Sequence, residues 1–573
     1  MPRNNSMTAR TVSKIWAACL LQVALFLPCA WSQSASRPSL ENRVQGTQQV
    51  AVDNRGARPL LDQGQRLEHE QRWADALNHY EKALLQDPSD LELQRRKTVA
   101  QIHCDIARRY VDSSFVQMAH TLDSSSAQEM YSDVLLKIEA HHVDSPQWQL
   151  VAQRGTEYLD VALTKKEFLN NHRILARPEQ VQAFRQELQG LTGRTASSRA
   201  DVQAVANWAA SRAADQLGIP SSAVMMEYVC GAIASLDEYS SYLTGSQLKD
   251  IYSQIEGNFV GLGVELKTDT DSLLILNVIP GGPADIVGIR PQDRITEVGG
   301  YSTKQISADQ AAEMLKGERG SAVDVTIVSP HTKAPRQVRV RRERVDVPSV
   351  EQARILDPKQ GVAYFRLTNF QKTTSRDVDA ALWRLHREGM KVLIIDLRGN
   401  PGGLLTAAVD VADKFIDKGM IVATRGRSPR ENFDYRAQSV GTWSVPLVVM
   451  IDKDSASASE ILAGAIHDHQ RGMIVGEQSY GKGSVQGIFP LSTSETGVRL
   501  TTALFYSPSG QQISRRGIQP NVLVHQVAKP VDEDQTLGGE PQAKSDNVLQ
   551  AAEEVARRLA PRQVLAQQIG ATR

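Results

Sequence analysis

The second half of the chain alternates short apolar runs with helical patterns, and this alternation is the strongest constraint on the fold. Strand-like runs occur at residues 362–367, 392–396, 446–451 and 473–475. Helical periodicity occurs between them, at residues 376–387, 404–415 and 459–467. Apolar runs of this length joined by helical segments predict adjacent parallel strands with helical crossovers, and therefore an α/β core.

Ser457 lies in one turn of this core, between the apolar run 446–451 and the helical segment 459–467. The turn, DSASASE at residues 454–460, consists mostly of small residues, so a substrate carbonyl can approach it closely. The start of a helix also offers free backbone N–H groups. Serine needs a base to become a good nucleophile, and on some folds that base is lysine. Spacing alone does not choose among Ser455, Ser457 and Ser459.

Lys482, in GKGSVQ at residues 481–486, is the candidate base. An ordinary lysine has a pKa near 10.4, so only about one in a thousand is neutral at pH 7.5. Burial in an apolar pocket can lower the pKa to about 7–8, whereas most lysines are solvated surface residues. Gln486 lies four positions later, on the same face of a helix or strand. Its neutral amide can hold the amine without favouring the charged form.

Five segments of the chain, in this order, carry a family resemblance. They are GAIASLDEYSSYLT at 231–244, DLRGNPGG at 396–403, the serine and lysine segments, and TTALFYSPSG at 501–510. Together they resemble the carboxyl-terminal processing proteases, which are serine endopeptidases with a serine–lysine dyad and an embedded PDZ domain. The resemblance extends over about residues 178–524 and implies a protease that requires no metal or cofactor.

The resemblance also assigns roles to individual positions. The implied site consists of Ser457 as nucleophile, Lys482 as general base, Gln486 as the residue that orients the lysine, Gly403 and Ala458 as oxyanion-hole amides, and Gly402 and Glu460 as supporting residues. Protein or peptide substrates with apolar C-termini are the implied partners. The alternative is a scaffold whose protease core is inactive and whose other modules bind partner proteins.

Glycine-interrupted β patterns begin near residue 257 and continue to about residue 345. This region resembles a PDZ domain, placed at residues 258–345. The loop of Gly261, Leu262, Gly263 and Val264 is expected to capture a peptide's terminal carboxylate through backbone N–H groups, while the peptide adds to the sheet edge. The alternative is a small β module without a ligand.

The region before residue 257 is predicted to be helical. Gly64, Ala76, Tyr80, Ala83 and Pro88 have the spacing of a tetratricopeptide repeat. A lone repeat cannot bury its own face, so residues 57–170 are expected to supply degenerate partner helices. This region is interpreted as a docking platform for an adaptor protein or as a plain spacer. Residues 171–257 are predicted to be the helical N-terminal part of the protease.

The N-terminus is predicted to direct export. Arg3, Arg10 and Lys14 precede an apolar run at residues 15–27, and small residues suited to a signal peptidase lead to cleavage after Ser32. The protein is therefore expected in the periplasm or outside the cell, with membrane association only if this segment is retained. A polar linker follows at residues 33–56.

The charge balance and the cysteine content give further expectations about partner molecules and disulfides. The chain has 65 basic and 65 acidic residues, which gives no indication of a nucleic-acid partner. Beyond the leader, Cys104 and Cys230 are expected to be free thiols, although an export compartment would allow a disulfide. The expected protein is thus a multidomain α+β chain with tetratricopeptide-like helices, a PDZ β-domain, an α/β protease core at 346–527 and a polar tail at 528–573 with a helix at 548–559.

Overall fold

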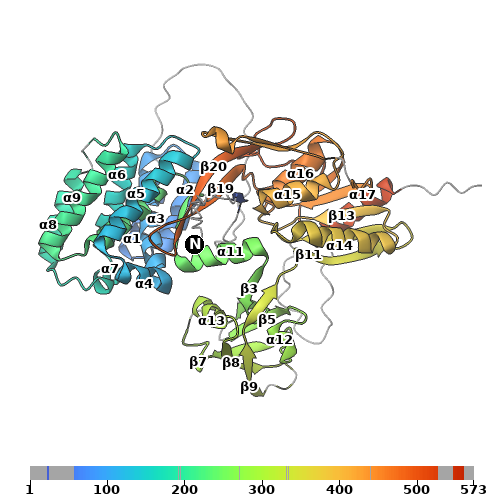
Figure 1. The fold of residues 1–573 in the computed structure, drawn as a ribbon, viewed down its shortest axis with the longest axis horizontal. Coiled ribbons are helices and arrows are strands. Elements are labelled where there is room, and N and C mark those ends of the chain that lie inside the picture. The colour runs from blue at the N-terminus through green and yellow to red at the C-terminus, as the bar shows by residue number, and fades with distance from the viewer. Residues whose placement is uncertain are drawn as a thin grey trace, which may run out of the picture.

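The computed structural model comprises three parts that lie side by side (Figure 1). It describes residues 22–24, 57–526 except 192, 194, 270, 271, 307, 331, 333, 439 and 440, and 546–560. A helical region lies on one side, an α/β core lies on the other, and a small β domain projects between them. The predicted signal segment and linker lie outside the described residues, apart from 22–24. The mixed α and β class predicted from the sequence is confirmed.

The helical region runs from residue 57 to residue 234. Its helices are α1 Ala57–His69, α2 Trp73–Gln86, α3 Leu91–Val111, α4 Ser113–Thr121, α5 Ser124–His141, α6 Trp148–Ala162, α7 Lys166–Asn171, α8 Pro178–Leu191, α9 Arg199–Leu217 and α10 Ser221–Ala234. Asp90 and Asp112 start α3 and α4 by accepting backbone N–H groups of the first turn, as N-cap residues do. Local capping signals therefore divide this region into helices.

The tetratricopeptide-like positions lie where α1 and α2 pack together. Gly64 is in contact with the ring of Tyr80, because a Cβ there would be 2.2 Å from a ring carbon. Ala76, Tyr80 and Ala83 are buried in a small core shared with α3. A larger core continues from α3 across residue 170 to α10, so the repeat-like unit is covered by neighbouring helices. Adaptor docking on this region stays a prediction.

The small β domain begins after α11 Gly245–Glu256. Its elements are β3 Asn258–Gly261, β4 Val264–Asp269, β5 Ser272–Val278, α12 Pro283–Ile286, β6 Arg294–Val298, β7 Tyr301–Ser302, α13 Ala308–Leu315, β8 Ala322–Val328, β9 Pro335–Arg341 and β10 Glu343–Asp346. The main sheet has the order β4-β5-β6-β8-β9. Strand β4 therefore forms an edge of this sheet, with one side open among the described strands.

The α/β core contains a sheet of order β11-β12-β13-β17-β18-β21. Its elements are β11 Val350–Asp357, β12 Val362–Leu367, α14 Thr374–Arg387, β13 Val392–Asp396, α15 Leu405–Asp413, β17 Leu447–Ile451, α16 Ala458–Asp468, β18 Gly472–Gly476 and β21 Val522–Leu523. All pairs except β11–β12 are parallel. The predicted parallel core is confirmed, with boundaries within about two residues of those expected.

Helices cover both faces of this sheet. Alternate strand residues such as Phe365 and Ile395 pack against α14, α15 and α16. The intervening residues, such as Tyr364 and Ile394, pack against α17 Asn547–Leu559. Side chains of a strand alternate between faces, so continuous apolar runs are explained by burial on both sides. The amphipathic helix predicted in the tail is thus an integral layer of the core.

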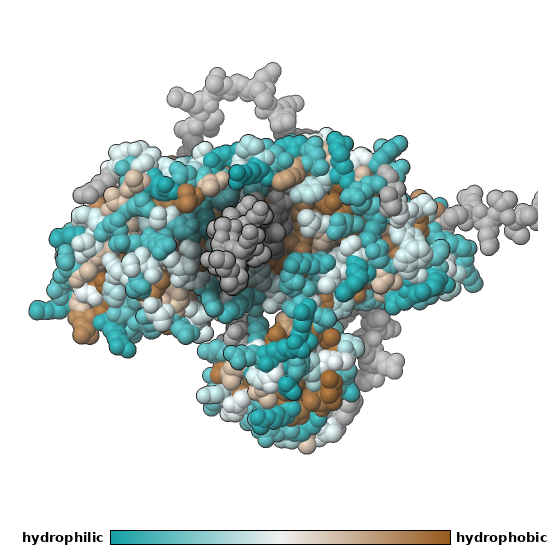
Figure 2. Space-filling view, viewed as in Figure 1, coloured by the Kyte–Doolittle hydropathy of each residue, from teal (hydrophilic) through white to brown (hydrophobic). Residues whose placement is uncertain are grey.

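A second sheet connects the core to the helical region. Its order is β14-β1-β19-β20-β15-β16, from β14 Gly403–Leu404, β1 Gln22–Ala24, β19 Ser484–Pro490, β20 Gly497–Tyr506, β15 Met420–Gly426 and β16 Phe433–Arg436. Strand β2 Ser241–Leu243, which follows α10, also pairs with β20. Strand β1 is antiparallel to both β14 and β19. Figure 2 shows that the surface is recessed between the two halves that this sheet joins.

Two further predictions concern thiols and membranes. Cys230 is buried and Cys104 is half-buried, and both are free thiols in the structure, as expected. Over the described part of the chain, no helix combines the length and apolar character needed to cross a bilayer. The apolar run at residues 15–27 lies outside the described part of the chain, apart from residues 22–24.

Candidate active site

The turn between β17 and α16 holds Ser457 in a strained backbone conformation. Ser457 directly precedes α16, with φ 57° and ψ −113°. Positive φ is uncommon for a residue with a side chain and costs roughly 1–3 kcal/mol, which the surroundings must offset. The side chain is buried, and its Oγ has no hydrogen-bond partner among the described residues. A strained turn that leaves a hydroxyl uncommitted is typical of a nucleophile.

The two neighbouring serines have structural hydrogen bonds instead. Ser455 Oγ donates to the Leu397 carbonyl at 2.9 Å, and Ser459 Oγ donates to the Asn400 carbonyl at 3.0 Å. Both bonds connect the serine turn to the loop that follows β13. The structure therefore distinguishes three serines that spacing could not separate, and Ser457 is the one whose hydroxyl is uncommitted.

The glycine-rich loop at residues 399–403 lies directly against the serine turn. Gly402 N–H donates to Asn400 Oδ1 at 2.9 Å, and Ala456 N–H donates to the Asn400 carbonyl at 3.0 Å. A Cβ on Gly402 would lie only 2.9 Å from the Ser457 Cβ. The two turns meet because they follow the carboxyl ends of adjacent parallel strands, β13 and β17.

Two backbone amides at this contact are candidates for an oxyanion hole. Ala458 is the first residue of α16, a position whose N–H has no acceptor within its own helix. A Cβ on Gly402 would lie 3.0 Å from the Ala458 nitrogen, so the glycine loop reaches this amide. Gly403 is the next residue and has φ 141°, a conformation that favours glycine. One donor thus comes from each turn.

Alanine at Gly403 is expected to lower kcat by about 10²–10³-fold, the usual effect of losing one oxyanion donor. The added Cβ would lie 1.9 Å from the Phe370 carbonyl oxygen, so β14 must move. Steady-state cleavage of an unstructured peptide measures the effect. Gly389→Ala is the control, because Gly389 also has positive φ, 96°, but an added Cβ meets no atom within 4 Å. Equal losses in both variants would contradict a local role for Gly403.

Lys482 lies in the loop between β18 and β19, and it is only 2% exposed. Its Nζ is 5.1 Å from the centroid of the Tyr239 ring. Burial, and after it the charge of Arg499, lowers the pKa of Lys482 to about 7. Nearby carboxylates oppose this shift but do not cancel it. An amine with a pKa near neutrality can take up and return a proton at physiological pH.

Glu460 connects the serine turn to the lysine loop through four hydrogen bonds. Its Oε2 accepts the N–H groups of Ser457 (2.7 Å) and Lys482 (2.9 Å). Its Oε1 accepts the Ser479 hydroxyl (2.6 Å) and the Gly481 N–H (2.7 Å). Burial raises the pKa of Glu460, and these donors oppose the rise. One carboxylate therefore sets the separation of the candidate nucleophile and base, which gives a physical reason for the supporting role expected of this residue.

Gln486 is placed differently from the expectation. It lies in β19 and is buried, but its Nε2 donates to Ser484 Oγ at 2.9 Å. Its Oε1 has no hydrogen-bond partner among the described residues. The structure therefore does not bring the amide into hydrogen bonding with Lys482. That Gln486 orients the lysine stays a prediction for a conformation in which the uncommitted oxygen is engaged.

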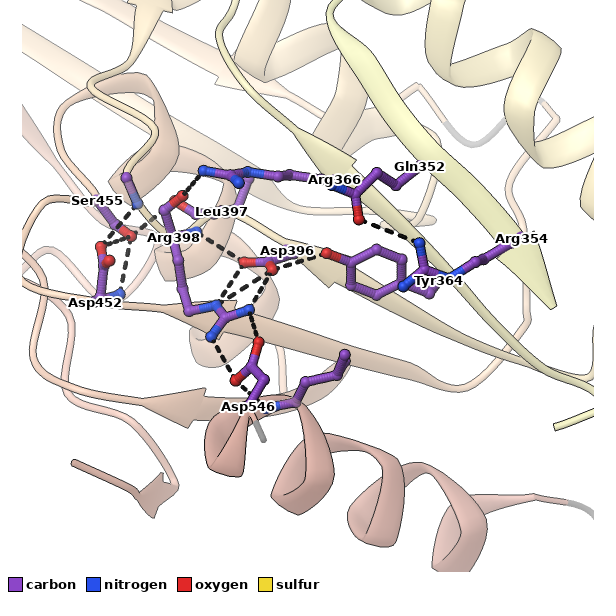
Figure 3. A network of polar contacts seen from close by, with 12 residues as sticks. Gln352, Arg354, Tyr364, Arg366, Asp396, Leu397, Arg398, Asp452, Ser455 and Asp546 are labelled. Carbon is purple, nitrogen blue, oxygen red and sulfur yellow. Dashed lines mark hydrogen bonds and ion pairs between the residues drawn. The ribbon is translucent and has the colours of Figure 1, made fainter. Parts of the chain in front are cut away.

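Arg398 stabilises the start of the loop that leads to Gly403, the candidate oxyanion-hole residue (Figure 3). Its guanidinium lies 2.7 Å from Asp396 Oδ2 and 2.7 Å from Asp546 Oδ2. Asp396 also accepts the Tyr364 hydroxyl at 3.0 Å, and Asp546 is the N-cap of α17. The C-terminal helix is thus attached to the strand end that leads into the glycine-rich loop. Both carboxylates are paired with Arg398, so these residues are interpreted as shaping the loop.

The predicted peptide-binding residues lie at the junction of β3 and β4. Gly263 has φ 77°, and its carbonyl accepts the Ile279 N–H at 2.9 Å. Leu262 is buried in the domain core, and its carbonyl accepts the Ala284 N–H at 2.9 Å. Gly261 and Val264 flank these two residues. The loop leads directly into the open edge of β4, where a peptide strand would add.

The sequence reasoning assigned no role to Tyr239 or Arg499, although both lie next to the candidate base. Tyr239 is in the 231–244 segment, one of the five that carry the family resemblance. Arg499 lies in β20, opposite Ser241 of β2. No sequence pattern around Arg499 indicates a role at the site, because its position there depends on strand pairing between residues far apart in the chain.

Comparison with known families identifies two regions. Residues 361–524 match the model described as "Peptidase family S41", and residues 251–328 match the model described as "PDZ domain". The first match contains the serine turn, the glycine-rich loop and the lysine loop. The second match contains the β3–β4 junction.

Individual proteins with similar sequences carry related names. The carboxy-terminal-processing protease of Bartonella bacilliformis is 36% identical over 315 residues, which cover 54% of this chain and 71% of the relative. The carboxyl-terminal-processing protease of Synechocystis sp. is 34% identical, covering 51% and 69%. A solved structure of a photosystem II D1 C-terminal processing protease is 25% identical, with a TM-score of 0.38, covering 70% of this chain and 93% of the other.

Proposed function

Because the chain belongs to the carboxyl-terminal processing proteases of peptidase family S41, we propose that it is an exported endopeptidase with Ser457 as nucleophile and Lys482 as general base. The observation that carries the assignment is the buried Lys482, whose pKa is lowered to about 7 and whose loop is bonded to the serine turn through Glu460. A surface lysine would have neither property.

The reaction begins when neutral Lys482 removes the proton of the Ser457 hydroxyl, and Oγ attacks a peptide carbonyl. The N–H groups of Ala458 and Gly403 stabilise the tetrahedral oxyanion, at roughly 3–4 kcal/mol per donor. The protonated lysine then gives its proton to the leaving amine, so the C–N bond breaks and an acyl-enzyme forms. Water, deprotonated by the same lysine, releases the acyl group. Ser457 Oγ must approach Lys482 Nζ for the first step, because it has no hydrogen bond in the described state.

The substrate backbone is proposed to bind as an extended strand between β14 and β19. Strand β1 supports this geometry, because Ala24 lies opposite Gly403 and Val23 lies opposite both Leu404 and Gln486. Main-chain pairing of this kind tolerates many sequences but requires an unfolded segment. The PDZ domain is proposed to supply selectivity, with the loop from Gly261 to Val264 capturing an apolar substrate C-terminus beside the edge of β4.

Export is proposed from the N-terminal pattern of basic residues, apolar run and small residues. Removal of residues 1–32 would also remove β1, and the edges of β14 and β19 would then be open to a substrate. The mature enzyme is accordingly placed in the periplasm or outside the cell.

The function is tested with two unstructured reporter proteins that differ only in their last residues, one ending in alanines and the other in aspartates. We expect the purified protein to cleave the first reporter faster, with products that mass spectrometry identifies. Binding of the apolar reporter without cleavage by the unmodified protein would contradict the proposal and favour the scaffold alternative. Equal cleavage of both reporters would contradict selection by the PDZ domain.

A further inference from the structure

The turn at residues 237–240, between α10 and β2, is organised by hydrogen bonds to one carboxylate. Asp237 Oδ1 accepts the Tyr239 N–H at 2.7 Å and the Thr501 hydroxyl at 3.0 Å. Its Oδ2 lies 2.8 Å from His142 Nε2, just after α5. Contacts from the turn itself, from β20 and from the helical region therefore converge on Asp237. The backbone of Tyr239 is fixed by this arrangement.

Tyr239 contacts the side chains of two basic residues, Lys482 and Arg499. The Lys482 Nζ is 5.1 Å from the centroid of its ring. The Arg499 Nε donates to its carbonyl oxygen at 3.0 Å. Arg499 lies in β20, where it pairs with Ser241 of β2. Ser241 follows Tyr239 by two residues, so strand pairing brings Arg499 close to Tyr239. Tyr239 therefore contacts both the candidate base and an arginine whose charge disfavours protonation of that base.

We propose that Tyr239 and Arg499 are positioning residues for the base Lys482: the tyrosine ring supports the amine, and the arginine anchors the tyrosine while disfavouring a second positive charge. This inference rests on the proposed function of Lys482. It also gives the helical region a role in catalysis, since His142 contacts the carboxylate that holds the turn.

The charges around the amine act in opposite directions. The groups that face Lys482 are Arg499 from β20, Glu460 from α16, and Asp237, Glu238 and Tyr239 from the turn. The carboxylates and the aromatic face favour the protonated amine. Burial and Arg499 favour the neutral amine. Arg499 is the one cation in this set, and a guanidinium keeps its charge at all relevant pH values, so it offsets the carboxylates that fold the site.

The test compares Arg499→Gln with Arg499→Lys in pH profiles of kcat/KM. The glutamine variant removes the charge, so we expect the acid limb to move upward by about one pH unit, which lowers activity roughly tenfold below the inflection. Activity should recover at high pH. Arg499→Lys keeps the positive charge, so its kcat/KM should depend on pH almost as in the unmodified protein. A uniform loss of kcat/KM at every pH, equal in both variants, would show a structural role and overturn the proposal.

A second measurement does not depend on activity. The Lys482 amine is titrated by ¹³C NMR of labelled lysine in the Ser457→Ala protein, with Lys482→Met used to assign the signal. When Arg499→Gln is combined with Ser457→Ala, the titration midpoint of Lys482 should rise by the same amount, about one pH unit. Tyr239→Phe keeps the ring and should leave the midpoint unchanged, whereas Tyr239→Leu removes the ring and should lower the midpoint, because the aromatic face favours the protonated amine. An unchanged midpoint in the Arg499→Gln protein would overturn the proposal even if that variant were inactive.

Failure of the proposed function and failure of the positioning role give different experimental results. If the proposed function is wrong, the unmodified protein lacks an acid limb near pH 7 and Lys482→Met does not abolish cleavage. If only the positioning role is wrong, both of those results hold, and the Arg499 variants leave the midpoint where it was.

Discussion

Replacing Ser457 with alanine is expected to lower kcat by about 10⁴- to 10⁶-fold, as for nucleophiles in other serine proteases. Among the described residues the Oγ has no hydrogen-bond partner, so its removal leaves none of them unsatisfied. Alanine also lacks the bulk that would strain the turn further. The variant should therefore remain folded, and circular dichroism together with reporter cleavage would measure both properties.

Ser459→Ala is the matched control, because it lies two residues away and is equally buried. It loses the hydrogen bond to the Asn400 carbonyl, which still accepts the Ala456 N–H, so the expected cost is about 0.5–1.5 kcal/mol of folding free energy. We expect lower stability with cleavage largely retained. The opposite pattern, with Ser459→Ala inactive and Ser457→Ala active, would show that the strained turn does not present the nucleophile.

Replacing Lys482 with arginine is expected to abolish cleavage to a similar degree. A guanidinium does not release its proton in proteins, so it cannot act as a base at any accessible pH. The unmodified protein should show a kcat/KM that rises through an inflection near pH 7, because burial lowers the pKa of Lys482 to about 7. The arginine variant should show no recovery up to pH 10. A rate that rises with pH in that variant would indicate a different base.

Lys482→Met should also change stability in a pH-dependent way. The amine has a pKa of about 7 in the folded state and about 10.4 in the unfolded state, so folding is penalised when the amine must be charged. The penalty is complete below pH 7, declines between these two pKa values and vanishes above the higher one. Methionine removes it, which should raise the free energy of unfolding at pH 6 by about 4–5 kcal/mol.

Urea unfolding at pH 6 and near pH 10 measures this stability difference. Lys453→Met is the control, because Lys453 directly precedes the serine turn but its side chain is 56% exposed. That variant should show almost no change at either pH. A Lys482→Met gain that is equal at both pH values would mean that the lost charge is not responsible.

Much of the α/β core was predictable because its signals are local. Apolar runs such as 392–396 are buried on both faces, so their composition alone identifies a strand. The turn at Ser457 follows from a strand that ends in small residues before a helix. Secondary structure here depends on neighbours in the chain, and the expected elements therefore matched the observed ones closely.

Other features depended on packing between distant segments. Spacing left three serines equivalent and the family resemblance implied Ser457, whereas in the structure Ser455 and Ser459 bond to the loop that follows β13. The Gln486 amide donates to Ser484, two residues earlier on the same strand, and the orienting role of Gln486 toward Lys482 stays a prediction. A side-chain amide has several partners within reach, and periodicity does not select among them.

Local patterns were thus sufficient for the order of strands, turns and helices, since burial and capping act over a few residues. The environment of Lys482 was decided in three dimensions, where Glu460, Tyr239 and Arg499 converge from separate elements. A pKa depends on burial and on charges across space, and the chain brings those together only when β20, α16 and the turn after α10 pack around one amine.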